Sequence, residues 1–282
     1  MDRRPIGVFD SGVGGLTVFR ALAAALPDES FVYLGDTARV PYGTKSPETV
    51  RRYAREASHF FRRQDVKLMV VACNTVSAVA MDAVAWEAGM PALGVILPGA
   101  RLAAEASRRK RIGVIGTRAT VGSGAYTRAI REVVPRAEVL SQACPLFVPL
   151  AEEGWTDNEV ARATAESYLA PLREAGVDAL VLGCTHYPLL KDTIAGVMGP
   201  GVALVDSAEA IAGAVRQRLD RERTLVAGRR EDGARPEHRF FVTDGPEPFT
   251  AIAARFLGRE PELLERVRIE PEGGEGEGEH AP

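Results

Sequence analysis

The chain has 282 residues, of which 46% are hydrophobic and 26% charged, and its formal net charge is -3 at pH 7. This length suffices for two compact domains, and the absence of a basic surplus argues against nucleic acid as a principal partner. No run approaches the roughly 18 apolar residues of a membrane span, and the first residues lack the apolar core of a signal peptide. We therefore expect a cytoplasmic protein that does not associate with membranes and acts on a small molecule.

The three cysteines, Cys73, Cys144 and Cys184, form no C-x-x-C motif. This pattern predicts reduced thiols and argues against a disulfide framework, a structural zinc site or a thioredoxin-type centre. None of the four lysines ends an apolar strand, so pyridoxal phosphate has no obvious anchor. We expect no cofactor and no metal. Cys144 precedes Pro145 without polar neighbours, which predicts a buried packing thiol.

Apolar strands and amphipathic helices alternate through the first hundred residues. The expected strands are 6–9, 31–34, the apolar run that ends before Cys73, and 92–95, and the expected helices are 16–26, 47–64 and 77–88. A turn is expected at 97–99. Such alternation favours an α/β fold with a parallel sheet flanked by helices on both faces.

A glycine-bearing loop, DSGVGG at 10–15, joins the first strand to the first helix. Its spacing departs from the G-x-G-x-x-G fingerprint of dinucleotide binding, which disfavours that function, although its amides could still receive an anion. Asp10 is either an N-cap of the helix or a site residue. Its place at the carboxyl end of a strand favours the site.

The loop 38–47 contains the turn Pro41, Tyr42, Gly43 and Thr44. This turn either lines a pocket with a tyrosine and bare backbone amides or is an ordinary turn packed by one aromatic ring. On the helix that follows, we expect His59 to have a structural role.

The pattern restarts at Arg111, which predicts two halves of similar plan. Strands are expected at 111–115, 138–141, before Cys184, and at 202–205, an extended segment at 145–150, and helices at 123–134, 158–172, 189–198 and 207–219. Cys73 follows Ile6 by 67 residues and Cys184 follows Ile112 by 72. Residues 220–239 are expected to form a charged loop or hairpin, 240–243 the last strand, 248–257 the last helix, and 270–282 a disordered acidic tail.

Each half therefore places one cysteine after a buried strand, followed by Asn74-Thr75 or by Thr185-His186. Polar groups at that end of parallel strands favour a ligand site. Two facing thiols suit a proton transfer in which one removes a proton from one face of a carbon and the other supplies a proton to the opposite face. This is the chemistry of a racemase or epimerase. Glu152, after an apolar segment, is either an additional acid or base, or a charge in the first turn of a helix.

Five segments carry a resemblance to a known family: GVFDSGVGGLTV (7–18), GDTARVPYGTKS (35–46), VVACNTVSA (70–78), GVIGTRATVGSGAY (113–126) and VLGCTHYPLL (181–190). Together they resemble the bacterial glutamate racemases of the cofactor-independent aspartate/glutamate racemase family. The resemblance covers almost the whole chain, apart from the charged loop after Asp220 and the acidic tail. It implies interconversion of L- and D-glutamate, which supplies D-glutamate for peptidoglycan.

The resemblance also implies residue roles. The implied proton carriers are Cys73 and Cys184, assisted by Asp10, His186 and, with the loosest local match, Glu152. The implied substrate contacts are Asp10, Ser11, Pro41, Tyr42, Gly43, Asn74, Thr75, Thr117, Thr120, Thr185 and His186.

The implied architecture is a pair of similar α/β domains related by a pseudo-two-fold axis, with the active site in the cleft between them. Residues 1–97 and 207–269 would form the first domain and residues 98–206 the second, in a homodimer. Residues alone would instead have given two consecutive halves.

Three alternatives stay open from the sequence. One is an aspartate or hydantoin racemase on the same scaffold, and a second is a related decarboxylase, which is expected to need only one cysteine. The third is a non-catalytic protein that binds a small molecule. Binding alone does not require the paired Cys-Asn-Thr and Cys-Thr-His motifs, which favours an enzyme.

Overall fold

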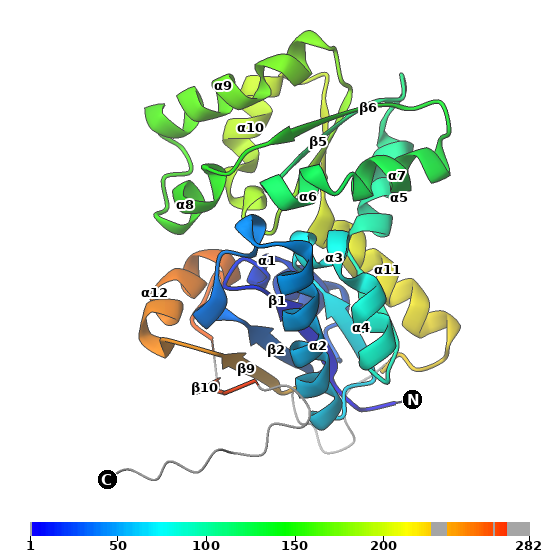
Figure 1. The fold of residues 1–282 in the computed structure, drawn as a ribbon, viewed down its shortest axis with the longest axis vertical. Helices are drawn as coiled ribbons and strands as arrows, with labels where there is room; N and C mark the ends of the chain where they lie inside the picture. The colour runs from blue at the N-terminus through cyan, green and yellow to red at the C-terminus, as the bar shows by residue number, and fades with distance from the viewer. Residues whose placement is uncertain (1, 227–235, 262, 270–282) are drawn as a thin grey trace.

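The computed structural model describes residues 2–226, 236–261 and 263–269. Its strands form two separate sheets, one above the other in Figure 1. The six-stranded sheet has the order β10-β9-β2-β1-β3-β4 and the four-stranded sheet the order β6-β5-β7-β8. Every pairing is parallel. The predicted α/β class with parallel sheets is therefore confirmed.

The strands of the six-stranded sheet are β1 (Ile6–Asp10), β2 (Phe31–Gly35), β3 (Leu68–Val71), β4 (Ala92–Gly94), β9 (His238–Val242) and β10 (Leu264–Arg266). Those of the four-stranded sheet are β5 (Arg111–Gly116), β6 (Glu138–Ala143), β7 (Ala179–Gly183) and β8 (Ala203–Asp206). The orders β2-β1-β3-β4 and β6-β5-β7-β8 match position by position. The repeat predicted from spacing is thus present in the topology.

Helices cover both faces of each sheet. The described helices are α1 (Leu16–Ala25), α2 (Pro47–Arg63), α3 (Asn74–Val79), α4 (Met81–Glu87), α5 (Ile96–Ala106), α6 (Arg118–Gly122), α7 (Ala125–Val133), α8 (Phe147–Glu152), α9 (Glu159–Glu174), α10 (Lys191–Met198), α11 (Ser207–Arg221) and α12 (Pro246–Leu257). Helices α1, α11 and α12 pack together on one face of the six-stranded sheet, and α2 and α4 on the other. For the four-stranded sheet, α9 and α10 oppose α5 and α7.

Capping residues in the sequence determine where two of the predicted helices begin. Ser46 caps α2 by accepting a hydrogen bond from the amide of Thr49, and Pro47 occupies the first helical position, where its missing N–H is not needed. Asn158 caps α9 in the same way through the amide of Ala161. These caps place the predicted helices 47–64 and 158–172 within two residues of their observed bounds.

Several predicted elements were wrong. The expected helix 77–88 starts at Asn74, directly after Cys73, and breaks at Ala80 into α3 and α4. The expected turn at 97–99 lies inside α5, because a proline in the first helical turn needs no N–H partner. The expected extended segment 145–150 is largely the helix α8 for the same reason, with Pro149 as its third residue. The strand β10 was not predicted.

The segment that carries the four-stranded sheet interrupts the segments that carry the six-stranded sheet. Helix α11 follows β8 and packs on α1. The boundaries after 97 and 206 stay a prediction, since α5 spans the first of them. Part of the expected loop 220–239 and the expected tail lie outside the described residues. Among the described residues, no helix combines the length and apolarity that a bilayer crossing needs.

Candidate active site

One small cavity brings together residues from both sheets. It is lined by Ser11, Gly12, Val13, Val40, Pro41, Tyr42, Gly43, Cys73, Asn74, Thr75, Thr117, Val148, Glu152, Cys184, Thr185 and His186. Its volume is about 70 Å³, against roughly 10–15 Å³ for one water molecule on the same measure. The cavity therefore suits a molecule of amino-acid size and is too small for a nucleotide.

Cys73 lies at the carboxyl end of β3, at the N-cap of α3. Its side chain is buried, and Sγ lies 3.5 Å from Oγ of Ser11. Burial raises the pKa of the Cys73 thiol to about 12, and the nearby carboxyl of Asp10 adds to the shift. Cys73 is therefore protonated at neutral pH.

Cys184 lies at the equivalent place after β7 and begins a chain of polar contacts. Its Sγ is 3.8 Å from Nδ1 of His186, whose Nε2 is 2.9 Å from Oε1 of Glu152. Burial disfavours the imidazolium, but the contacts with Cys184 and Glu152 outweigh burial and raise the pKa of His186 to about 10. His186 is therefore charged at neutral pH, and it lies between the sulfur of Cys184 and the carboxyl group of Glu152.

Asp10 lies behind the cavity wall, because it is buried and is absent from the lining. Its Oδ2 accepts a hydrogen bond from the amide of Gly12 at 2.9 Å, and its Oδ1 has no partner among the described residues. Burial raises the pKa of the Asp10 carboxyl. The N-cap of α1 is Gly15, so the alternative in which Asp10 caps that helix is wrong.

Hydroxyl and amide groups fill the wall between the two sheets. The hydroxyl groups of Thr75 and Thr117 form a hydrogen bond, with 3.0 Å between their Oγ1 atoms. The Oγ1 of Thr120 lies 3.0 Å from that of Thr117, but Thr120 does not line the cavity. Asn74 accepts a hydrogen bond from the hydroxyl of Tyr126 at 2.7 Å. These contacts connect α3, which follows β3, to α6 and α7, which follow β5.

The turn at 41–44 lines the cavity through its first three residues, which confirms the pocket interpretation of its position. The hydroxyl of Tyr42 donates to Asp36, a fully buried carboxylate that also pairs with Arg39 at 2.6 Å. A Cβ on Gly43 would come within 2.8 Å of Thr117, so the turn packs closely on the other half of the molecule. Tyr42 thus contributes its ring, while its hydroxyl is engaged by Asp36.

Sequence reasoning did not select Asp36 or Tyr126. A signal for Asp36 existed, because it follows the buried strand β2 directly, as Asp10 ends β1. Tyr126 gave no such signal, because it lies on α7 and reaches Asn74 only through the packing of the two halves.

The family model for Asp/Glu/hydantoin racemases matches residues 6–215. The chain belongs to the Asp/Glu/hydantoin racemase family. It is 54% identical to a glutamate racemase of Geobacter metallireducens over 96% of this chain and 99% of that protein. It is 50% identical to a glutamate racemase of Chlorobaculum tepidum over 93% of this chain and 96% of that protein. The resemblance found in the motifs is confirmed.

Solved structures of racemases have the same fold. The glutamate racemase of Francisella tularensis in complex with D-glutamate superposes with a TM-score of 0.88 at 39% identity, over 96% of this chain and 99% of that chain. The glutamate racemase of Thermus thermophilus in complex with β-chloro-D-alanine superposes with a TM-score of 0.84 at 47% identity, over 95% of this chain and 98% of that chain. These likenesses extend across both sheets of this racemase-family chain.

Cys144 stays apart from the cavity of this family member. It is fully buried in the core between the four-stranded sheet and α8 to α10, which confirms the predicted packing role. Its backbone carbonyl accepts a hydrogen bond from the hydroxyl of Tyr187 at 2.8 Å. His59, also buried, contacts Glu87 at 3.1 Å and lies on α2, outside the lining of the cavity.

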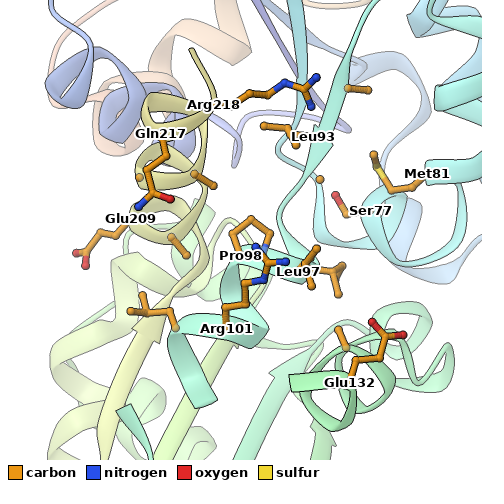
Figure 2. A pocket seen from close by; sticks show the side chains of 18 of the residues that line it. Ser77, Met81, Leu93, Leu97, Pro98, Arg101, Glu132, Glu209, Gln217 and Arg218 are labelled. Carbon is orange, nitrogen blue, oxygen red and sulfur yellow. The ribbon is translucent and has the colours of Figure 1, made fainter. Parts of the chain in front are cut away.

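A larger cavity of about 930 Å³ opens elsewhere in this racemase-family chain, between α4, α5, α7 and α11. Figure 2 shows Arg101 and Arg218 reaching into it beside Leu93, Leu97 and Pro98. The described residues that line it include no cysteine or histidine. Because the acid–base side chains line the small cavity, we identify that cavity as the candidate active site. In the described ranges, no three His, Cys, Asp or Glu side chains are grouped as metal ligands.

Proposed function

We propose that this protein is a glutamate racemase, which interconverts L- and D-glutamate by proton transfer at the α-carbon and uses no cofactor. One observation carries the proposal. Cys73 and Cys184 come from equivalent strand ends of two sheets and line the same small cavity. The names of the relatives, at about half identity over nearly the whole chain, support glutamate as the substrate.

In the proposed reaction, one cysteine as thiolate removes the α-proton and the other as thiol protonates the opposite face of the same carbon. The bond from carbon to hydrogen breaks toward one sulfur and forms from the other, so no electrons are gained or lost. Cys73, whose pKa burial raises to about 12, supplies the thiol when the reaction starts at Cys184. The imidazolium of His186 then places a positive charge 3.8 Å from the sulfur that acts as base.

The polar wall fits the rest of glutamate. We assign the two carboxylates to hydroxyls and amides of residues that line the cavity, namely Ser11, Asn74, Thr75, Thr117 and Thr185. Asp10 lies behind the cavity wall, so we assign it to holding the loop that bears Ser11, through the hydrogen bond that it accepts from the amide of Gly12. Pro41, Tyr42 and Gly43 would close the side-chain end. Thr120 would hold Thr75 and Thr117 in place rather than contact the substrate.

The cellular setting is part of the same proposal. The product would be D-glutamate for peptidoglycan, made in the cytoplasm by a homodimer. The fold supports the proposed division into a domain of residues 1–97 and 207–269 and an inserted domain of residues 98–206, because each segment builds its own sheet.

The test uses L-glutamate in deuterium oxide with no cofactor added. We expect D-glutamate that carries deuterium at the α-carbon, detected by proton NMR and chiral chromatography. Aspartate and a hydantoin run in parallel separate the proposed substrate from the alternatives. Folded protein that neither racemises glutamate nor exchanges its α-proton would overturn the proposal.

A further inference from the structure

Helix α12 approaches the candidate site from beyond the residues that the family model matches. That match ends at residue 215, whereas α12 spans Pro246–Leu257. The helix packs on α1 beside the six-stranded sheet. Figure 1 shows it on the same side of the molecule as α8, which belongs to the other half. Two consecutive residues of α12, Arg255 and Phe256, contact residues in the other half of the molecule.

The first is Arg255, whose Nη1 donates a hydrogen bond to the backbone carbonyl of Glu152. Glu152 is the last residue of the six-residue helix α8, where backbone carbonyls have no partner within the helix. Arginine side chains satisfy such carbonyls and favour the negative end of the helix dipole. Arg255 also covers the turn at Gly154, where a Cβ would lie 3.4 Å from Nε.

The second is Phe256, which is fully buried and meets the ring of His186 edge to face at a centroid distance of 5.2 Å. This contact lies on the imidazole whose Nε2 contacts Glu152 at 2.9 Å. One turn of α12 therefore holds both members of the His186–Glu152 pair, the carboxylate residue by its backbone and the imidazole by its ring.

We infer that α12 is a positioning element for the acid–base pair, with Arg255 and Phe256 as positioning residues. The inference rests on the proposed function for its kinetic consequence alone. Glu152 needs such support, because its side chain is 37% exposed and its helix is short. A short helix gains little stability from its own hydrogen bonds. A contact from the other half of the molecule fixes its last residue beside His186.

The experiment compares Arg255→Ala and Arg255→Lys with Arg162→Ala. Arg162 is a matched control, because it is an exposed arginine on α9 whose side chain forms a long ion pair with Asp157 at 3.9 Å. For Arg255→Ala we expect kcat to fall by about tenfold to a hundredfold, the scale for a catalytic group displaced by about 1 Å, with KM nearly unchanged. Lysine, which keeps one charged donor, should restore part of the rate. Arg162→Ala should match wild type.

A second readout needs no activity. Titration of His186 by NMR, assigned with His186→Asn, reports its contact with Glu152 directly. The titratable groups that face His186 are Cys184, Glu152 and Asp10. Removing the positive charge of Arg255 would by itself raise the pKa of His186. We expect Arg255→Ala to lower it instead, toward the ordinary value of 6.5, because Glu152 moves away.

The outcomes separate the two proposals. Wild-type racemase activity with an unchanged His186 pKa and unchanged kcat in Arg255→Ala would overturn the role of α12. A lowered His186 pKa in a protein that does not racemise glutamate would support that role and overturn the proposed function.

Discussion

Gly14 lies against His186 so closely that a Cβ built on the glycine would come within 2.5 Å of Nδ1 of the imidazole. The same Cβ would lie 2.3 Å from Oγ1 of Thr185. The glycine-bearing loop after β1 therefore serves the approach of the two halves of the molecule. This close approach gives a physical reason for a glycine at position 14 that does not require a nucleotide.

We predict that Gly14→Ala lowers kcat/KM by at least about a hundredfold, the scale for misplacing a catalytic group by about 1 Å. The methyl group must displace His186 or Thr185, since no flexible side-chain end is available to give way. Steady-state kinetics in both directions measures the effect. Gly196→Ala is the control, because a Cβ there meets nothing within 4 Å and lies in α10. It should keep full activity and gain about 0.5–1 kcal/mol of stability.

Substitution of each cysteine by alanine should distinguish the two proposed proton carriers from Cys144 by their effect on racemisation. We expect Cys73→Ala and Cys184→Ala each to lose racemisation by at least about a thousandfold, within the range for removal of a general acid or base. Cys144→Ala should stay within about threefold of wild type and lose about 1 kcal/mol of stability through a small cavity. Chiral analysis of the product and chemical denaturation measure the two quantities. Equal loss of activity in all three variants would contradict the assignment of the proton carriers.

Much of this site could be predicted because its residues follow strands. Cys73 and Cys184 each end a buried apolar run, and parallel strands bring such ends to one edge. Glu152 shows where this reasoning stops. Two prolines made residues 145–150 resemble an extended segment, yet Pro149 lies in the first turn of α8 and does not interrupt it. Glu152 is therefore the last residue of a helix, whereas the alternative from the sequence placed it in the first turn of one.

Other features had no local signal. The strand β10 is only three residues long, with two of them charged, and it exists through its pairing with β9. The contact of Arg255 with Glu152 joins residues 103 positions apart. Such contacts depend on how the two halves pack, which neither periodicity nor spacing encodes.

Tyr126 should influence activity through Asn74, the neighbour of Cys73. Its hydroxyl donates to Oδ1 of Asn74 at 2.7 Å from a fully buried position. Tyr126→Phe leaves that oxygen unpaired, and we expect a loss of about 1–3 kcal/mol in stability and of about tenfold in kcat/KM.

Tyr187→Phe is the matched control for this prediction, because it removes an equally buried hydroxyl that donates to the backbone of Cys144. It should lose similar stability and keep its activity. Equal kinetic effects in the two variants would argue against a role of Tyr126 in orienting Asn74.

The raised pKa of His186 makes stability depend on pH. The pKa of His186 is 6.5 in the unfolded chain and about 10 in the folded protein. Between pH 6.5 and pH 10, therefore, the imidazole is mostly protonated in the folded state and mostly neutral in the unfolded state. The stabilisation is complete below about pH 6.5 and falls as pH rises. Cys73, with an ordinary value of 9.0 raised to about 12, adds its own loss only above pH 9. Between pH 7 and 9 the contribution of His186 can therefore be observed apart from that of Cys73.

The measurement is the free energy of unfolding of wild type minus that of His186→Asn, across pH 7 to 9. We expect this difference to fall by about 1.4 kcal/mol per pH unit, the value for one proton. Groups that do not contact His186 titrate alike in both proteins and cancel. A difference that stays constant with pH would show that His186 is neutral in the folded protein.

A buried ion pair at the opposite end of the six-stranded sheet should govern stability without touching the chemistry. Lys67 precedes β3 and pairs with Glu29 at 2.7 Å, with both side chains at most 2% exposed. Lys67→Met leaves a buried carboxylate without its cation, which costs about 3–5 kcal/mol. The double variant with Glu29→Leu removes both charges and should be more stable than Lys67→Met alone. Because β3 delivers Cys73 at its other end, folded protein of either variant should keep its kcat. Denaturant titration and kinetics at low temperature check both statements, and a double variant less stable than the single one would contradict them.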